Sequence, residues 1–521
     1  MVVYHYDKAL MSSVYTANNK TIAKNTIYLY LRMIVSLAIS LYTSRAFLDA
    51  LGIDDYGIYN VVGGFVALLN VITSSLIQGA QRFITFELGK GDAQKLHRTF
   101  ATFSTLFFLM AIVIFVIGTL LGAPLISRFL VIPEGRIDAA IFVFYCSLGA
   151  FAINLIAIPY NACVIAHEKM KFYALVSISE SLGKLLIVYA LYVTSFDRLK
   201  VYALLIVALG LVIRLAYGIY CSKHFPETKT RFFLDKTILK EVTTFSLWMA
   251  LGGIAVTAKE QGVNVVINLF CGVAINAARG VSMQVSSILG QFASSIAFAI
   301  TPQITKSYAE GNFQRSVNLT FLLTKVQGVM LFLIAIPLYF EIDFLLALWL
   351  KCVPYYANVF AQWALIVTFL STIRNTYGPL YLATGDVKTL QWTISLIYVL
   401  ILPFSYVALK LGYEPVSTMQ ITAIIEVITW LASFYYMKYK FKFPLGQYII
   451  KVMLRLISVF TITVVILILL QKLMVESSFL RLLIITAIST FVILILSYML
   501  LLSHSERVMV NDFINKKLYK K

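Results

Sequence analysis

The chain has 521 residues, of which 60% are hydrophobic and 13% are charged, and its formal net charge is +19. The share of charged residues is about half that of a soluble globular protein. Apolar runs of roughly 20 residues recur along the chain, each long enough to cross the ~30 Å hydrocarbon core of a bilayer. These features exclude a large soluble helical protein and predict an all-α polytopic membrane protein.

About fourteen membrane-spanning helices are expected. Their approximate limits are 25–48, 56–79, 99–122, 138–161, 173–194, 201–221, 243–268, 274–300, 318–340, 356–380, 389–409, 417–437, 450–471 and 482–502. With the N-terminus inside, and with the basic stretch 438–455 counted as inner, the inner segments hold 27 of the 43 basic residues and the outer segments hold 8. Because positive residues favour the cytoplasmic side, both termini are expected there. The net charge therefore needs no nucleic acid as a partner.

An internal repeat predicts two six-helix lobes. When the sequence is shifted so that Gly52 lies over Gly272, ITFELGKGDAQK (84–95) lies over ITKSYAEGNFQR (304–315). Transporters built from two repeats keep their substrate site between them. The expected organisation is an N-terminal segment, an N-lobe, a basic linker, a C-lobe, two accessory helices and a basic tail, over residues 1–24, 25–221, 222–242, 243–437, 438–502 and 503–521.

Polar residues recur at helical spacing in both halves. The first span carries Tyr28, Arg32, Ser36, Ser40 and Ser44, and the seventh carries Thr257, Glu260, Asn264 and Asn268. Residues four apart share one face of a helix, so each set forms a polar stripe. Gln284 and Gln291 extend the pattern into the eighth span. The stripes are expected to line a polar cavity, although such residues also join helices together.

Ionisable residues within spans are costly and usually face a bundle interior or a water-filled cavity. Basic residues outnumber acidic ones inside the expected spans, so the cavity should prefer an anion. Guanidinium groups suit phosphate because they donate two parallel hydrogen bonds. The candidates for an anionic head group are Arg32, Arg45, Lys184, Lys259, Arg279, Lys325 and Arg374. The candidates for Na⁺ or H⁺ coupling are Glu180, Glu260 and Glu426.

Several of these charges have a structural alternative. Lys325 and Arg374 lie towards the expected cytoplasmic ends of their spans, and Arg45 lies towards the outer end, so all three are placed to snorkel to lipid head groups. Glu180 and Lys184 are one helical turn apart and suit a structural ion pair. No cofactor, metal site or catalytic group is expected. The five cysteines have neither disulfide nor metal spacing and are interpreted as packing residues.

Two segments carry a resemblance to a known family. RMIVSLAISLYTSRAFLDALGIDDYGIYNVVGG (32–64) and KEQGVNVVINLFCGVAINAARGV (259–281) resemble the bacterial oligosaccharide flippases of the multidrug/oligosaccharidyl-lipid/polysaccharide exporter superfamily. The similarity extends over essentially the whole chain, and the NAARG run at 276–280 is its most specific part.

The resemblance implies a V-shaped, two-lobed transporter of the bacterial inner membrane that is related to multidrug and toxin extrusion transporters. It would move undecaprenyl-diphosphate-linked oligosaccharide by alternating access through a cationic cavity between the lobes, for O-antigen, capsule or exopolysaccharide synthesis. A monomer that works beside a polysaccharide polymerase and other assembly proteins is expected.

Two other functions stay open. An ion-coupled multidrug exporter of the same superfamily would move cationic amphiphiles, which a basic cavity disfavours. A membrane glycan polymerase or ligase would be expected to have a large outer loop, whereas the longest outer loops expected here are the short segments 123–137 and 341–355.

Overall fold

The computed structural model describes most of the chain. It covers residues 2–129, 135–229, 232–350, 353–474, 478–503, 506–508 and 511. Within these ranges the side chains are described except for residues 2–23, 41, 44, 45, 48, 52–54, 56, 57, 60–72, 123, 125–129, 273, 274, 276 and 277.

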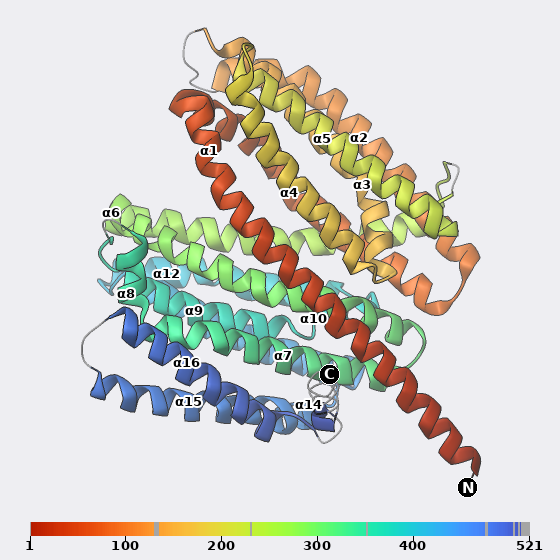
Figure 1. Cartoon of the computed structure of the whole chain (residues 1–521), viewed down its shortest axis with the longest axis vertical. Coiled ribbons are helices and arrows are strands. Elements are labelled where there is room, and N and C mark those ends of the chain that lie inside the picture. Colours follow the sequence, from red (N-terminus) through yellow and green to blue (C-terminus); the bar gives the residue numbers. More distant parts are fainter. Residues whose placement is uncertain are drawn as a thin grey trace, which may run out of the picture. The chain divides into compact units, whose positions relative to one another are not determined.

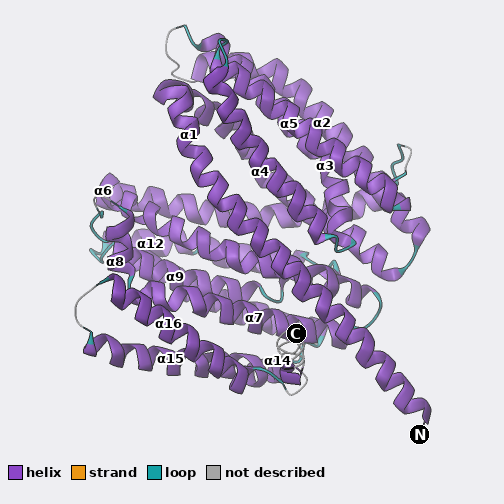
Figure 2. Ribbon diagram, viewed as in Figure 1, coloured by secondary structure: helices purple, strands orange, loops and turns teal. Residues whose placement is uncertain are grey.

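Helices make up the described residues, joined by short turns and loops (Figure 2). The α-helices are α1 Val2–Lys90, α2 Ala93–Phe129, α3 Ile137–Ala166, α4 Met170–Val193, α5 Arg198–His224, α6 Lys236–Ala309, α7 Phe313–Phe340, α8 Ile342–Trp349, α9 Ala357–Asn375, α10 Gly378–Thr384, α11 Lys388–Val399, α12 Ile401–Lys410, α13 Ser417–Phe441, α14 Leu445–Tyr448, α15 Leu454–Leu473 and α16 Phe479–Leu496. Eleven stretches of the described residues are long and apolar enough to cross a membrane. The predicted class, an all-α polytopic membrane protein, is confirmed.

Helices α1 and α6 each contain two of the expected spans. Helix α1 has 89 residues, and a straight helix of that length would measure about 130 Å. That is several times the ~30 Å thickness of the hydrocarbon core, so we expect the chain to reverse its direction within α1. The rings of Phe47 and Tyr59 lie 5.2 Å apart, which places the reversal over the expected loop at 49–55. In α6 the reversal is at Gly272, whose φ of 76° and ψ of −176° interrupt the helix.

The tenth expected span, 356–380, is not among the eleven apolar stretches. Its place is taken by α9 and the short α10, and polar residues occur through α9, including Gln362 and Arg374. The first two expected spans lie in α1, where many side chains are not described. The eleven stretches account for the remaining expected spans.

The backbone reproduces the sequence repeat. Helices α2 and α3 begin at Ala93 and Ile137, and the shift that superposes Gly52 on Gly272 places these starts on those of α7 and α9, at Phe313 and Ala357. The same shift relates Gly91, which follows the end of α1, to Gly311, which follows the end of α6. Their φ angles are 74° and 79°. Glycine adopts positive φ at little cost, which suits these two turns.

The chain forms two compact units. One consists of Ala23–Gly253 and Thr305–Asn312, and the other of Met1–Ile22, Ile254–Ile304 and Phe313–Lys521. In the first unit α3 packs against both α2 and α5. In the second unit α9 packs against α13 and against α7, and the last two helices can be followed in Figure 1. Below we call these the N-unit and the C-unit.

The two last long helices belong to the C-unit. Both α15 and α16 pack against α7, and Gly328 of α7 leaves room for Leu456, which a Cβ would approach to 2.7 Å. Arg481, at the start of α16, forms a buried ion pair of 2.9 Å with Glu341 in the turn after α7. The pair of helices is therefore fixed to the C-unit by packing and by charge.

Candidate functional site

A buried network of charged groups lies in the C-unit. Glu426 of α13 is at its centre and is 1% exposed. Its carboxylate accepts hydrogen bonds from Lys259 Nζ at 3.2 Å, from Arg374 Nε at 3.0 Å and from Tyr398 Oη at 2.9 Å. Four helices, α6, α9, α11 and α13, therefore converge on one acidic side chain.

The network holds more positive than negative charge. Lys259 and Arg374 share one carboxylate, and both also lie over the ring of Tyr398, at 4.4 Å and 5.5 Å from its centroid. The electron-rich face of an aromatic ring attracts cations, which partly compensates for the missing second acid. The four side chains together still carry one net positive charge. A buried positive charge without a matching acid is costly, and it attracts anions.

Arg279 is a further buried cation of the C-unit. It follows the reversal at Gly272, and its Nη1 donates to Asn264 Oδ1 and, at 3.2 Å, to the backbone oxygen of Glu260. Its Nε is buried and has no hydrogen-bond partner among the described residues. The guanidinium group thus joins the two parts of α6 and retains an unused donor.

Helix α6, which carries Lys259 and Arg279, also has exposed polar residues. Gln261 and Asn268 are exposed before the reversal. After it, the exposed polar residues follow at intervals of three and four and are Gln284, Ser287, Gln291 and Ser294. This spacing keeps them on one helical face. Gln291 Nε2 donates to Ser287 Oγ and Ser294 Oγ donates to Gln291 O. Contact with lipid would still leave part of the hydrogen-bonding capacity of this face unused, so a face of this kind suits water or a polar ligand.

In the N-unit, the expected stripe of α1 packs against α4. Arg32 Nη1 donates to Tyr173 Oη at 3.0 Å, and Ser36 accepts a hydrogen bond from Ser181 at 3.2 Å. Ser40 is exposed and donates to Leu37 O in its own helix. The inner part of the stripe therefore joins two helices, as its structural alternative predicts. The side chains of Ser44 and Arg45 lie outside the described part of the structure.

Glu180 and Lys184 form the pair expected from their spacing. Their Oε1 and Nζ atoms lie 2.7 Å apart, and the side chains are 41% and 46% exposed. Tyr217 of α5 is within electrostatic reach of both Glu180 and Arg32. The N-unit thus holds its own cluster of charges, which is more open than the network around Glu426.

Lys325 does not join either cluster. It lies on α7, is 8% exposed, and pairs with Glu506 at 2.8 Å. Burial raises the pKa of Glu506, but the hydrogen bonds from Lys325 and Ser503 and the charge of Lys325 together outweigh burial and hold the pKa below its usual range. This lysine binds the C-terminal segment to α7.

The three acids proposed for ion coupling have different surroundings. Glu426 accepts hydrogen bonds from three side chains, and Glu180 is paired with Lys184. The described residues place no ion-pair partner on the carboxylate of Glu260, although its charge acts on Arg279. Glu260 is therefore the acid whose carboxylate is most available to a coupling ion.

Tyr398 is the one member of the Glu426 network that the sequence analysis did not single out. It lies on α11 in an ordinary apolar run, and its hydroxyl donates to Glu426. A buried tyrosine usually finds a partner for its hydroxyl. That tendency was the available signal, but the sequence could not identify the partner.

Comparison with solved structures identifies the fold. A structure described as an outward-facing multidrug resistance MATE family transporter of the MOP superfamily matches 80% of this chain and 95% of its own, with a TM-score of 0.68 and 14% identity. The chain has the MATE fold. The MATE transporter ClbM in complex with Rb⁺ matches with a TM-score of 0.66 and 17% identity, covering 80% of this chain and 94% of its own.

A third match is a MOP superfamily transporter from Pyrococcus furiosus whose description reports reverse polarity of its binding pocket. It has a TM-score of 0.64 at 14% identity and covers 80% of this chain and 95% of its own. No protein-family model matches the chain, and no curated protein matches it.

Proposed function

We propose that the chain is a flippase for an anionic lipid-linked glycan. It would move a polyprenyl-diphosphate-linked oligosaccharide across a bacterial inner membrane for the synthesis of O-antigen, capsule or exopolysaccharide. The observation that carries this proposal is the net positive charge buried in the C-unit, where Lys259 and Arg374 share Glu426 and Arg279 lies nearby in the chain.

A diphosphate head group needs such a site to cross a membrane. Its charges cannot enter hydrocarbon without losing their hydration, which is very costly. Lysine and arginine can replace part of that hydration, and arginine can donate two parallel hydrogen bonds to one phosphate. The unused Nε of Arg279 is a donor of the required kind.

The sugar part of the substrate needs neutral hydrogen-bonding groups. The exposed amides and hydroxyls of α6, from Gln261 to Ser294, are groups of this kind. The polyprenyl tail can stay in the lipid, so the protein has to shelter only the head group. Neither step requires covalent chemistry, and we propose no enzymatic activity.

The same fold also supports a multidrug exporter, because two of the matched structures are described as MATE transporters and one of these as a multidrug resistance transporter. Such an exporter would be expected to offer acidic groups to its cationic drugs. In the C-unit Glu426 already binds two cations. A glycan polymerase or ligase has less support, since α2–α3 and α8–α9 are joined by short segments.

Proteoliposomes can test the proposal directly. A fluorescent polyprenyl-diphosphate oligosaccharide is placed in the bilayer, and a membrane-impermeant quencher reports how much reaches the other leaflet. The wild-type protein should accelerate flipping, and Arg279→Gln should slow it by about tenfold or more, as expected for loss of a charge-assisted hydrogen bond. Arg279→Lys keeps the charge but not the planar fork, so it should fall between the two.

Two results would overturn the proposal. One is a wild-type protein that leaves the glycan lipid in place but drives the uptake of a cationic dye under a Na⁺ or H⁺ gradient. The other is flipping by Arg279→Gln and Lys259→Gln at the wild-type rate. In cells, loss of the gene should abolish a surface glycan, and a rise in drug sensitivity alone would support the multidrug exporter.

A further inference from the structure

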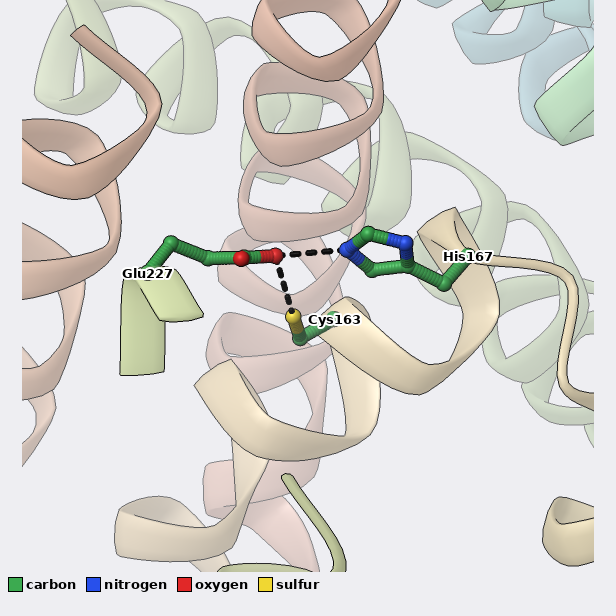
Figure 3. A group of neighbouring side chains, drawn as sticks. All are labelled: Cys163, His167 and Glu227. Atoms are coloured by element: carbon green, nitrogen blue, oxygen red, sulfur yellow. Dashed lines mark hydrogen bonds and ion pairs between the residues drawn. The ribbon is translucent and has the colours of Figure 1, made fainter. Parts of the chain in front are cut away.

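Three side chains of different chemistry meet in the N-unit, and none of them belongs to the charged clusters described above. Figure 3 shows the thiol of Cys163 and the imidazole of His167 directed at one oxygen of Glu227. The three ligand atoms lie within 4.8 Å of one another. The interpretation of Cys163 as a packing residue was therefore incomplete.

Local structure explains why the three meet. Cys163 and His167 are four residues apart at the end of α3, so they lie on the same helical face. Glu227 lies in a short 3₁₀ turn, Pro226–Thr228, which follows α5. The ring of His167 stacks on Phe225 with 4.1 Å between centroids. This stacking holds the imidazole with its Nε2 towards Glu227.

The cluster is shielded from solvent and has an acidic character. Cys163 is fully buried, and the side chains of Glu227 and His167 are 7% and 22% exposed. Among the described residues no lysine or arginine forms an ion pair with Glu227. Cys163 Sγ and His167 Nε2 both lie within hydrogen-bonding distance of Glu227 Oε1. The site thus contains a buried carboxylate whose side-chain contacts are a thiol and an imidazole.

The distances suit a small metal ion after modest side-chain movement. Sγ of Cys163 is 3.3 Å from Glu227 Oε1, and Nε2 of His167 is 2.5 Å from the same oxygen. Bond lengths of about 2.0–2.3 Å to tetrahedral zinc place neighbouring ligand atoms about 3.3–3.6 Å apart. The sulfur and oxygen already have this separation. The nitrogen and oxygen must separate by about 1 Å to reach it, which rotation of the carboxylate allows.

We propose that Cys163, His167 and Glu227 form a Zn²⁺ site with three protein ligands. A thiolate, an imidazole and a carboxylate form a ligand set that zinc accepts, whereas Mg²⁺ and Ca²⁺ prefer oxygen ligands alone. Binding converts the Cys163 thiol into a thiolate and releases its proton, and the imidazole binds in its neutral form. The fourth position is left to water on the partly exposed side of His167.

The bound ion would fasten two parts of the N-unit together. Cys163 and His167 end α3, whereas Glu227 belongs to the segment between α5 and α6. That segment lies within the basic linker expected from the sequence over residues 222–242. Zinc would hold the start of this linker against α3. Cys221 is also buried nearby, but its thiol donates to Tyr160 O at 3.5 Å and is not assigned as a ligand.

The alternative is a cluster held by hydrogen bonds alone, in which the thiol and the imidazole satisfy the buried carboxylate. The two possibilities differ in their response to substitution. Glu227→Gln keeps a hydrogen-bonding side chain of the same size but removes the negative charge. A cluster held by hydrogen bonds should tolerate this change, whereas a zinc site should bind the ion much less tightly.

The experiment uses the purified full-length protein in detergent, stripped of metal with a chelator. Zn²⁺ is then titrated in competition with a coloured zinc indicator, and Co²⁺ serves as a spectroscopic probe. The wild type should bind one Zn²⁺ per chain and give a sulfur-to-cobalt charge-transfer band. Cys163→Ser should abolish the band, and Cys163→Ser and Glu227→Gln should each weaken zinc binding at least tenfold.

Cys146→Ser is the matched control, because Cys146 lies on the same helix α3 but outside the cluster. It should bind zinc and cobalt as the wild type does. The proposal fails if the wild type binds no zinc, or if Cys163→Ser binds it with unchanged affinity and an unchanged cobalt band. Unaltered glycan flipping by the stripped protein would leave the proposed function standing, since the two sites are separate.

Discussion

Helix α4 of the N-unit begins at Met170, and the corresponding helix α11 of the C-unit begins at Lys388. Superposing the starts of these two helices places Glu180 opposite Tyr398. In the N-unit the position holds an acid that pairs with Lys184 on the same helix, and both side chains are nearly half exposed. In the C-unit it holds a tyrosine that donates to Glu426 on the neighbouring helix α13, within a buried network.

The two units share the spacing of their helices, but they differ in where their charged side chains lie and in how these side chains are paired. An exposed pair within one helix contributes little to stability. A buried acid that joins several helices is costly to disturb, because its partners then remain buried without compensation. The C-unit therefore carries the surplus positive charge at a fixed place, whereas the N-unit can rearrange its charges more freely.

The difference between the two units can be tested most directly by substituting Glu426 and Glu180. Glu426→Gln leaves Lys259 and Arg374 buried without a counter-ion and should lower the free energy of unfolding by about 3–5 kcal/mol. Glu180→Gln, the matched control, should change it by less than about 0.5 kcal/mol. Thermal unfolding of the two variants in detergent measures the difference. Equal losses would show that the buried and exposed acids are equivalent.

A second test concerns the backbone at the reversal of α6. Gly272 has φ of 76° and ψ of −176°, a region that is nearly restricted to glycine. Gly272→Ala should therefore destabilise the protein by about 1–3 kcal/mol, although a Cβ there would meet no atom within 4 Å.

Gly280→Ala is the control for this substitution. A Cβ at Gly280 also meets nothing within 4 Å, and its φ is not positive. Alanine should stabilise the helix there by up to about 1 kcal/mol. The repeat predicts a loss at Gly52 similar to that at Gly272. A neutral Gly52→Ala would show that the two reversals are built differently.

The smallest expected effect depends on pH and belongs to the N-unit alone. Arg136 lies between Asp55 and Asp197, at 2.5 Å and 2.6 Å, whereas the repeat places Tyr356 at the corresponding position of the C-unit. Burial raises the pKa of Asp197, but hydrogen bonds from Arg136 and from the backbone N–H of Lys200 outweigh burial and lower the pKa.

Because the pKa of Asp197 is lowered by folding, its contribution to stability is present above the ordinary carboxyl range and is lost as pH falls below about 4. The wild type should lose about 1 kcal/mol more than Arg136→Gln between pH 6 and pH 3. Unfolding temperatures of both proteins across this range provide the measurement. If the wild type and Arg136→Gln lost the same stability over this pH range, the ion pair of Asp197 with Arg136 would make no such contribution.

The positions of most helices could be predicted because hydropathy is a local property of the sequence. Helix α9 lies where the tenth span was predicted, although its polar residues keep it out of the stretches that are apolar enough to cross a membrane. The reversal between Phe47 and Tyr59 was also predicted, from a short polar segment between two apolar runs.

The partners of the charged residues could not be predicted in the same way. Lys259 and Glu426 are 167 residues apart, and Lys325 and Glu506 are 181 apart. The snorkelling alternative for Arg374 is wrong, because its side chain is buried against Glu426. Sequence composition showed a surplus of basic residues, but which acid each one meets depends on how distant helices pack.

The ion pair between Arg481 and Glu341 has a consequence for any attempt to shorten the chain. The last two long helices lie outside the repeat, so a truncated twelve-helix protein is an obvious design. Removing them would take Arg481 away and leave Glu341, which is 1% exposed, without its counter-charge. A shortened protein would need a neutral residue at position 341, because α16 supplies the counter-charge of a buried acid in the turn after α7.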